Sequence, residues 1–342
     1  MNARIESIAF GAPAKLRPRL GFLGLGWIGR QRMQVVRASG AAEIAAIADT
    51  NPAVLDIAAG CAPEAARASS LDALFDHDID GLVIATPSAT HAWQAIAALR
   101  RGVAVFCQKP LARTADEAMQ VVAAARCAGL LLDVDFSYRR LAGMSVLRDS
   151  IHAGELGEIY AIDLAFHNAY GPDKPWFDDI AQSGGGCVMD LGIHLIDLAS
   201  WMCGGTRAFG LNARLHANGR ALEPPLDVVE DYATAHWQTE TGASVRMACS
   251  WRLHAGCDAV IHAAFHGTRG GAMLRNVDGS FYDFVLERFD RTRRERLAGP
   301  PDEWGGRSLV HWSRRLAEGA GFDDESERLV DIARIVDGIY GR

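Results

Sequence analysis

The chain has 342 residues, a length that suggests two domains of ordinary size. It is 49% hydrophobic and 23% charged, which is typical of globular proteins and excludes wholesale disorder. Its formal charge is −7, and the sequence contains no cluster of lysines and arginines interleaved with aromatic residues. Because nucleic-acid binders usually carry the opposite charge, we expect no nucleic-acid partner.

The seven cysteines are widely spaced and form no C-x-x-C motif. This argues against a zinc clip or a redox pair and indicates a reducing compartment. We find no apolar run of the ~18 residues that a membrane helix needs, and the first apolar run, 20–28, is broken by glycines. We therefore expect a cytoplasmic protein with no membrane partner.

Short apolar runs alternate with helical patterns in the first part of the chain, after an irregular leader over residues 1–18. The predicted strands are 19–23, 43–48, 81–85, 103–107 and 130–134, and the predicted helices include 89–101 and 114–127. The second helix opens with a capping box, Thr114 to Glu117, and is followed by Gly129. Continuous apolar strands joined by helices predict an α/β Rossmann domain over residues 1–135, with a doubly wound parallel sheet.

The pattern changes after residue 136, where longer alternating segments are separated by turn signals. The predicted strands are 159–167, 227–238, 243–252, 258–265 and 280–287, and the predicted helices are 141–153, 190–203, 306–317 and 325–339. They predict a second, α+β domain over 136–342, with a largely antiparallel open sheet for substrate binding and oligomerisation. We expect the open face to be apolar and to join subunits in a homodimer or homotetramer.

The first motif that carries chemistry is Gly24-Leu-Gly26-Trp27-Ile28-Gly29, between a predicted strand and a predicted helix. Glycines allow a sharp turn and close approach to a pyrophosphate, and the helix N-terminus supplies amide donors. Asp49 ends the next predicted strand, where a ribose-binding acid belongs. The alternative is a glycine-rich turn with Asp49 capping the next helix, but the combined context favours a dinucleotide site.

Asp49 also bears on the choice of cofactor. A carboxylate there accepts hydrogen bonds from ribose hydroxyls and repels a 2′-phosphate. The next two residues, Thr50 and Asn51, supply no cation, although Arg30 and Arg32 follow the glycine loop. The sequence therefore favours NAD over NADP.

The second motif is Gln108-Lys109-Pro110, at the end of a predicted strand of the same sheet. Open α/β sheets bind ligands at the carboxyl ends of their strands, so Lys109 could donate to a substrate oxygen or exchange a proton. Pro110 keeps Lys109 out of the helical region, and their peptide bond could be cis. The alternative is a solvated surface lysine before a turn.

The third motif runs from Gly184 to His194 and contains Asp190 four residues before His194. Residues four apart share a helix face, so we expect the Asp190 carboxylate to orient the imidazole for proton transfer. The pair could also bind a metal, but no third ligand lies at a recognisable spacing, so we expect no metal. Alternatively, Asp190 is a helix cap and His194 a core residue.

In combination, these motifs resemble the Gfo/Idh/MocA family, the glucose–fructose oxidoreductase and inositol dehydrogenase relatives. The resemblance runs from about Leu20 to Ala208. It is carried by Gly24–Gly29, Ala85-Thr86-Pro87 with His91, Gln108-Lys109-Pro110-Leu111-Ala112, Tyr138-Arg139, Gly154-Glu-Leu-Gly157-Glu158-Ile, and Gly184–Gly186 with Asp190 and His194.

The resemblance implies a catalytic set of Lys109, Asp190 and His194, which holds the reacting carbinol while hydride passes to nicotinamide. It also implies additional cofactor contacts at Thr86, Pro87, His91, Gln108 and Lys109, and substrate contacts at Tyr138, Trp176, Asp190 and His194. Trp176 could stack on a sugar or on the nicotinamide, or it could be a structural tryptophan.

One departure from the family pattern concerns the residue before the lysine. The family usually has Glu-Lys-Pro where this chain has Gln108-Lys109-Pro110. Glutamine keeps the size and the hydrogen-bonding capacity of glutamate but removes one negative charge beside Lys109. The loss of a nearby anion would lower the lysine pKa, which need not harm proton transfer.

The resemblance implies an NAD(P)-dependent oxidoreductase that acts on a carbinol of a sugar, an inositol-like polyol or a related hydroxy compound. One alternative is an NAD-using enzyme of the glycosidase type, in which the cofactor is reduced and reoxidised within a turnover. Another is a non-catalytic nucleotide-binding sensor, which would not need all three catalytic residues. The substrate itself, and whether Lys109 or His194 is the general base, stay open.

Overall fold

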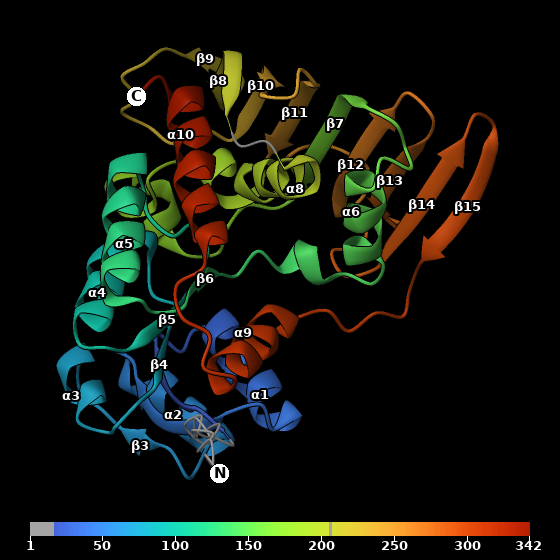
Figure 1. Cartoon of the computed structure of the whole chain (residues 1–342). Helices are drawn as coiled ribbons and strands as arrows, with labels where there is room; N and C mark the ends of the chain where they lie inside the picture. The colour runs from blue at the N-terminus through green and yellow to red at the C-terminus, as the bar shows by residue number, and fades with distance from the viewer. Residues whose placement is uncertain (1–16, 205–206) are drawn as a thin grey trace, which may run out of the picture.

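A computed structural model describes residues 17–204 and 207–342, which form two sheets with flanking helices (Figure 1). A six-stranded parallel sheet has the order β3-β2-β1-β4-β5-β6, and a nine-stranded sheet has the order β15-β14-β13-β12-β7-β11-β10-β8-β9. The predicted fold class is confirmed. The leader predicted over 1–18 falls almost entirely outside the described residues.

The six-stranded sheet is the predicted doubly wound Rossmann sheet. Its strands are β1 (Arg19–Leu23), β2 (Glu43–Ala48), β3 (Ala66–Arg67), β4 (Gly81–Ile84), β5 (Ala104–Cys107) and β6 (Leu132–Val134). Its helices are α1 (Trp27–Ser39), α2 (Pro52–Cys61), α3 (Leu71–Phe75), α4 (Ser88–Arg100) and α5 (Ala115–Ala128). The strand order reverses between β1 and β4, so a ligand is expected at the carboxyl ends of these strands.

Helix α5 begins and ends close to the predicted residues. The Thr114 hydroxyl accepts a hydrogen bond from the Glu117 amide, and Gly129 closes the helix in the left-handed conformation. The Glu117 carboxylate, however, reaches the amide of Arg113, one residue before the expected partner. It also pairs with the Arg113 guanidinium, and this additional attraction explains the longer reach.

The nine-stranded sheet is mostly antiparallel, but β7 and β11 pair in parallel. Its strands are β7 (Ile159–Asn168), β8 (Ala208–Ala217), β9 (Arg220–Leu222), β10 (Tyr232–Thr239), β11 (Ser244–Ser250), β12 (Ala259–Gly267), β13 (Gly271–Asn276), β14 (Phe284–Asp290) and β15 (Arg293–Ala298). The sequence prediction missed β8, β9, β13 and β15. Strand β15 is mostly exposed, so it lacks the buried alternation that a sequence pattern requires.

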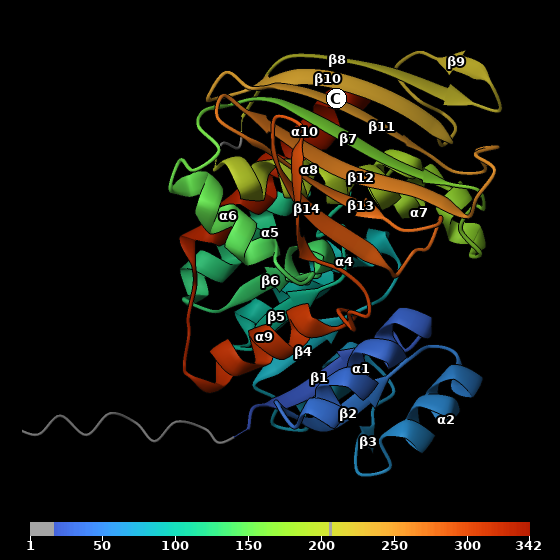
Figure 2. The same cartoon turned by 90° about the vertical axis from the view of Figure 1, so that its right-hand side faces the viewer.

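Most of the remaining helices lie beneath the nine-stranded sheet, and α9 (Arg307–Ala317) lies beside the Rossmann sheet (Figures 1 and 2). These helices are α6 (Met144–His152), α7 (Ile180–Ser183), α8 (Ile193–Cys203), α9 and α10 (Arg328–Tyr340), with short turns η1 (Ser137–Arg140), η2 (Pro175–Asp178), η3 (Val188–Gly192) and η4 (Asp324–Glu327). Contrary to our expectation, the segment Ile180–Cys203 is long and apolar enough to cross a membrane. The 18-residue window that meets this criterion is nevertheless 83% buried within the protein, as expected of a core segment.

Helix α9 packs on the Rossmann sheet, although it lies after residue 135 in the sequence. The domain division predicted at residue 135 stays a prediction. The helix belongs to the second part of the sequence, yet its Trp312 is fully buried in the core of the Rossmann domain. The Trp312 ring lies 5.7 Å from the ring of Phe106 on β5. Helix α9 thereby packs against β5, the strand that precedes Lys109.

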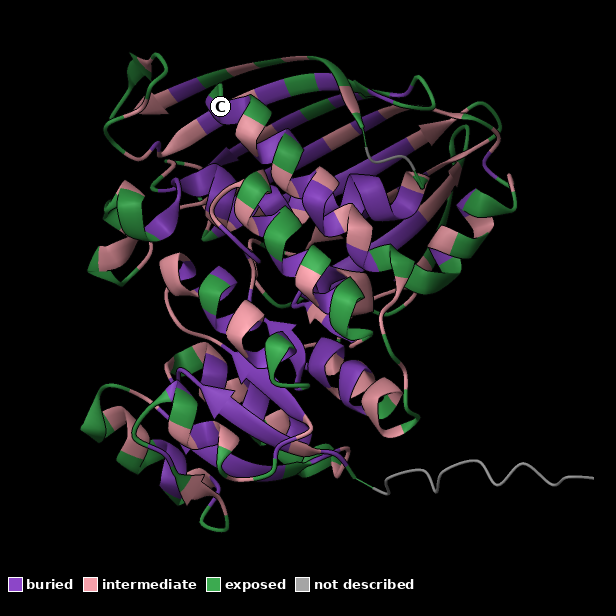
Figure 3. Cartoon of the chain, turned by 60° about the vertical axis from the view of Figure 1, so that its left-hand side comes forward, coloured by how far each residue is buried: buried purple, intermediate pink, exposed green. Residues whose placement is uncertain are grey.

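The open face of the second sheet is polar, and the prediction of an apolar face is wrong. Ala233, Ala235 and Trp237 are buried beneath the sheet, whereas His236 and Gln238 are exposed on the other side. Figure 3 shows this alternation along the strands, in contrast to the central strands β4 and β5 of the first sheet, which are buried throughout. The buried face already packs against α8 and α10, so the apolar residues are used inside the domain.

Candidate active site

The glycine loop between β1 and α1 has three glycines with different constraints. Gly24 has φ +86°, and a Cβ atom there would lie 2.5 Å from the Ala85 carbonyl oxygen. A Cβ on Gly29 would lie 2.1 Å from the Gly24 carbonyl oxygen, so both positions exclude a side chain. Gly26 faces open space at the N-terminus of α1, with nothing within 4 Å of a Cβ atom. The loop thus fits a pyrophosphate that approaches the backbone at Gly26.

Asp49 lies beside this loop. Its Oδ2 atom accepts a hydrogen bond from the Leu25 amide at 2.7 Å, and its Oδ1 atom accepts one from Asn51 at 2.8 Å. The side chain that caps α2 is Asn51, which accepts from the Ala53 amide, so Asp49 is not the helix cap. Trp27, in the first turn of α1, is 58% exposed next to the loop.

The two arginines after the loop, Arg30 and Arg32, differ in whether they are available to bind a cofactor phosphate. Arg32 is 7% exposed, and its guanidinium pairs with the buried carboxylate of Asp135 at 2.5 Å. Arg30 donates a hydrogen bond to the Leu25 carbonyl oxygen at 3.1 Å. Arg32 is therefore committed inside the protein and unavailable to an external phosphate.

Lys109 follows β5 and is joined to Pro110 by a cis peptide bond, as the sequence allowed. Its Nζ atom donates to Asp190 Oδ1 at 2.6 Å and to the Asp190 carbonyl oxygen at 2.7 Å. The side chain of Lys109 is 19% exposed. Lys109 is thus a partly buried, paired cation, which excludes the alternative of a freely solvated lysine.

Asp190 lies in a π-helical turn, η3, and has a second side-chain partner. Its Oδ2 atom accepts a hydrogen bond from Trp251 Nε1 at 3.0 Å. Trp251 follows β11, 61 residues away in sequence, and the sequence analysis did not single it out. Because only sheet pairing brings β11 to η3, no local sequence signal could have found this contact.

Within the described residues no hydrogen bond joins Asp190 to His194, which corrects the expectation that the carboxylate orients the imidazole directly. The two Asp190 oxygens are instead engaged by Lys109 and Trp251, and Asp190 acts on His194 through its charge. His194 Nδ1 is buried without a partner among the described residues, and the ring packs 5.1 Å from that of Tyr138. Burial, and next the Lys109 cation, lower the pKa of His194 to about 3. The imidazole is therefore neutral at physiological pH.

The start of the His194 helix is fixed by Glu230, another residue that the sequence analysis missed. This carboxylate is 0% exposed and accepts hydrogen bonds from the amides of Gly186 at 2.9 Å and Val188 at 2.8 Å. The Tyr340 hydroxyl donates to it at 2.9 Å. Glu230 thus acts as a helix cap supplied from a distant segment.

The residues around the β4 and β5 ends hold the two loops together. His91 is 1% exposed, and its ring nitrogens lie 2.7 Å from the carbonyl oxygens of Pro110 and Thr86. Pro87 precedes α4 as its N-cap residue. Gln108 is 8% exposed and donates to Asp135 at 2.6 Å. His91 and Gln108 thus bind protein groups, and their side chains position the loops.

A small cavity adjoins the Lys109–Asp190 pair. Trp176 and Phe177 form one wall, with their rings stacked 3.8 Å apart. Tyr138 packs against His194 and is 7% exposed. Trp176, Lys109, Asp190 and Tyr138 are thus drawn from four separate segments into one region.

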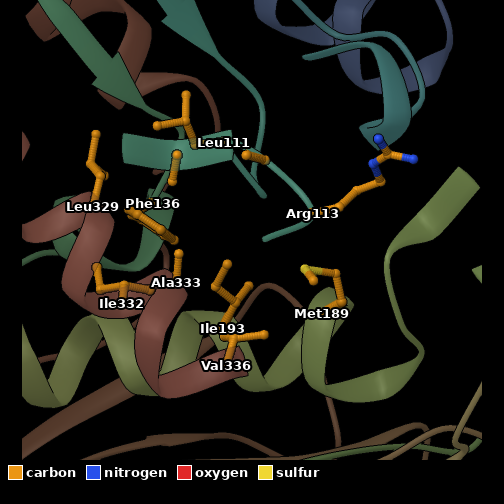
Figure 4. A pocket seen from close by; sticks show the side chains of 11 residues that line it. Leu111, Arg113, Phe136, Met189, Ile193, Leu329, Ile332, Ala333 and Val336 are labelled. Carbon is orange, nitrogen blue, oxygen red and sulfur yellow. The ribbon is translucent and has the colours of Figure 1, made fainter. Parts of the chain in front are cut away.

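A second cavity lies behind the site and is lined by apolar side chains and by Arg113 (Figure 4). Met189 and Ile193 face it from η3 and the start of α8, the continuous segment called the site helix below. Leu111 faces it from the segment after Lys109, and Leu329 faces it from α10. Met189 lines both cavities. The position of the site helix is therefore set by apolar packing between the domains.

The described residues contain no group of three or more histidine, cysteine or acidic side chains that could hold a metal. The polar groups of the site are instead a cation, a carboxylate and a neutral imidazole. Such a set can hold a hydroxyl group and exchange its proton.

Comparison with protein families assigns both halves of the chain. Residues 18–136 match "Oxidoreductase family, NAD-binding Rossmann fold", and residues 144–273 match "GFO/IDH/MocA C-terminal domain". The two matches meet close to the predicted domain division.

Individual relatives agree with these families. A putative UDP-kanosamine synthase oxidoreductase subunit of Amycolatopsis mediterranei (strain S699) is 31% identical over 76% of this chain and 76% of its own length. Inositol 2-dehydrogenase of Rhizobium meliloti (strain 1021) is 28% identical over 75% and 76%, respectively. A solved structure of levoglucosan dehydrogenase with NADH has a TM-score of 0.80 at 23% identity, covering 95% of this chain and 97% of its own. That structure supports the fold.

Proposed function

Since the chain belongs to the Gfo/Idh/MocA family of NAD(P)-dependent oxidoreductases, we propose that it transfers hydride between nicotinamide and a carbinol of a sugar or polyol. Inositol-like polyols and related hydroxy compounds fall within this class. The observation that carries the proposal is the Lys109–Asp190 ion pair beside the neutral imidazole of His194. These groups match the needs of a reacting hydroxyl, which requires an acceptor for its proton and a cation for its oxygen.

The glycine loop with Gly24, Gly26 and Gly29 is the proposed pyrophosphate site, and Asp49 is the proposed ribose ligand. Trp27, Ile28, Thr86 and Pro87 complete the proposed cofactor surface around the strand ends. We favour NAD over NADP because Asp49 would repel a 2′-phosphate and Arg32 is committed to Asp135. When bound, the nicotinamide would accept or return the hydride.

His194 is the proposed proton acceptor in the oxidation direction. Its imidazole is neutral, so a ring nitrogen carries a lone pair, whereas the Lys109 ammonium has none while it is paired with Asp190. Lys109 would stabilise the negative charge that develops on the substrate oxygen. Asp190, held by Trp251, would keep Lys109 in place and bind a neighbouring hydroxyl.

Tyr138 and Trp176 are the proposed substrate walls. Tyr138 packs against His194, and Trp176 lines the cavity with Lys109 and Asp190. Aromatic rings beside several hydroxyl-binding groups suit a ring-shaped polyhydroxy compound.

The proposed activity is tested by incubating the protein with NAD and a panel of sugars and inositols while absorbance at 340 nm is followed. Net NADH formation with one member supports the dehydrogenase. Consumption of a glycoside without net NADH would instead indicate the glycosidase-type alternative, and NAD binding without any turnover would indicate a sensor.

We also propose a cytoplasmic enzyme that assembles as a homodimer or homotetramer through the open sheet face. All seven cysteines are free, which suits a reducing compartment. The nine-stranded sheet has no helix of the described residues on its polar face (Figure 2).

A further inference from the structure

A buried polar cluster lies where the ends of β5 and β6 meet helix α1. Its centre is Asp135, which directly follows β6 and is 1% exposed. The Oδ2 atom of Asp135 accepts hydrogen bonds from Arg32 Nε at 2.5 Å and from Gln108 Nε2 at 2.6 Å. Ser137 donates its hydroxyl to Oδ1 at 2.7 Å. One carboxylate therefore connects the helix after the glycine loop to the residue that precedes Lys109.

The Asp135 carboxylate is an anion. Burial would raise its pKa, but Arg32 and the hydrogen bonds from Ser137 and Gln108 hold the pKa below its ordinary value. The backbone also fixes its place, since the Asp135 amide donates to the Cys107 carbonyl oxygen at 2.9 Å. A buried ion pair of this kind costs desolvation energy that a pair of apolar side chains would not. Its presence therefore invites an explanation beyond stability.

The charged groups of the cluster affect the pKa of His194, the proposed proton acceptor. Four charged groups face His194, namely Lys109 after β5, Asp190 in η3, Asp135 after β6 and Arg32 on α1. Lys109 and Arg32 lower the pKa of His194, whereas Asp190 and Asp135 raise it. Asp135 does not line the cavity beside Lys109, and it acts on the site through Gln108, Arg32 and its charge.

We propose that Asp135 is a positioning residue of the dehydrogenase site, which holds Gln108 and the following Lys109 in a fixed place relative to α1. Gln108 supplies the neutral amide that this arrangement needs, because a second carboxylate there would repel Asp135. The negative charge that the family pattern places before the lysine is thus provided by Asp135 from the neighbouring strand. The inference rests on the catalytic role proposed for Lys109.

The test is to move the carboxylate from position 135 to position 108. Asp135→Asn leaves Arg32 without its anion, and Gln108→Glu places two carboxylates in contact, so each should lower kcat by about tenfold or more. The double variant Gln108→Glu/Asp135→Asn restores one anion and one amide. Its kcat should return to within about threefold of the unmodified protein, because the two changes compensate each other. If the two changes were purely destabilising, their effects would instead add in the double variant.

A second readout separates positioning from stability. In Asp135→Asn the acidic limb of the kcat/KM profile should move to lower pH, because an anion that favours protonated His194 has been removed. The control is Asp323→Asn, which breaks the remote Arg315–Asp323 ion pair of 2.7 Å and should change only thermal stability. If Asp135→Asn lowers Tm but keeps the kcat and pH profile of the unmodified protein, or if the double variant shows no recovery, the inference is overturned.

Lys109→Met is measured in the same series. Full activity of that variant would refute the proposed catalytic role of Lys109. An inactive Lys109→Met together with a fully active Asp135→Asn would refute only the positioning role.

Discussion

Both carboxylate oxygens of Asp190 are engaged, Oδ1 by Lys109 and Oδ2 by Trp251. This leaves no hydrogen bond from Asp190 to His194 among the described residues, and the neutral imidazole is the proposed acceptor for the proton of a substrate hydroxyl. The depressed pKa of His194 also affects stability. Because only the unfolded chain takes up this proton, the free energy of unfolding decreases as the pH falls from 6.5 toward 3.

Replacing Lys109 tests both its proposed catalytic role and its effect on the pKa of His194. Lys109→Met should lower kcat by about 10²-fold or more, because the cation opposite the developing alkoxide is lost. The same variant should raise the pKa of His194, since the Lys109 cation is one of the causes that lower it. NMR titration of the imidazole measures this shift. An unchanged or lower pKa would contradict the electrostatic account.

The cofactor preference can be reversed by a charge change beside the glycine loop. Asp49→Ser combined with Thr50→Arg should shift the ratio of kcat/KM values from NAD toward NADP, because a repulsive charge is replaced by an attractive one. Asp49→Ser alone should weaken NAD binding without creating NADP affinity, which makes it the control. Tighter binding of NADP than of NAD by the unmodified protein would refute the role of Asp49.

At the scale of elements, the site helix depends on glycines that allow close approach of a distant segment. A Cβ on Gly186 would lie 1.9 Å from the Glu230 carbonyl oxygen, and one on Gly185 would lie 2.0 Å from the Tyr340 hydroxyl oxygen. The resulting contact lets Glu230 cap the first turn and sets the π-helical turn that carries Asp190. The glycine run in the sequence indicated a special backbone, but not which residues it approaches.

Two glycine substitutions separate this close approach from helix propensity. Gly186→Ala should destabilise the protein by roughly 1–3 kcal/mol, because the backbone of Glu230 cannot yield to a methyl group. Gly60→Ala, in helix α2 with nothing within 4 Å of its Cβ position, should instead stabilise by about 0.5–1 kcal/mol. Thermal unfolding measures both. Equal effects of the two changes would argue against a specific contact at Gly186.

At the scale of the whole molecule, α9 and α10 return across the domain boundary and place the two halves of the site. Trp312 on α9 packs on the strand before Lys109, and α10 lines the apolar cavity behind the site helix (Figure 4). The open sheet face carries ionisable groups, including His262, Arg246 and Asp163, instead of the expected apolar residues. An interface there would be polar and sensitive to pH.

The assembly is expected to weaken in acid. Burial lowers the pKa of His167 and His262 on this face, and coverage by a partner would oppose their protonation further. Since the free subunit binds these protons more readily, the dimer dissociation constant should rise by about tenfold as the pH falls from 8 to 5.5. Light scattering measures it, and His262→Gln should reduce the effect. A monomer at micromolar concentration and pH 8 would refute assembly through this face.

Short-range patterns in the sequence predicted the Rossmann half, the glycine loop and the motifs at Lys109 and Asp190, because such patterns specify strands, tight turns and strand ends. They also included the glycine run before the site helix. The folded chain was needed to show that Lys109 pairs with Asp190, that Trp251 and Glu230 support the site helix, and that His194 Nδ1 has no hydrogen-bond partner among the described residues. These contacts join residues that are tens of positions apart. Their geometry depends on sheet register and on a π-helical turn, neither of which leaves a local pattern in the sequence.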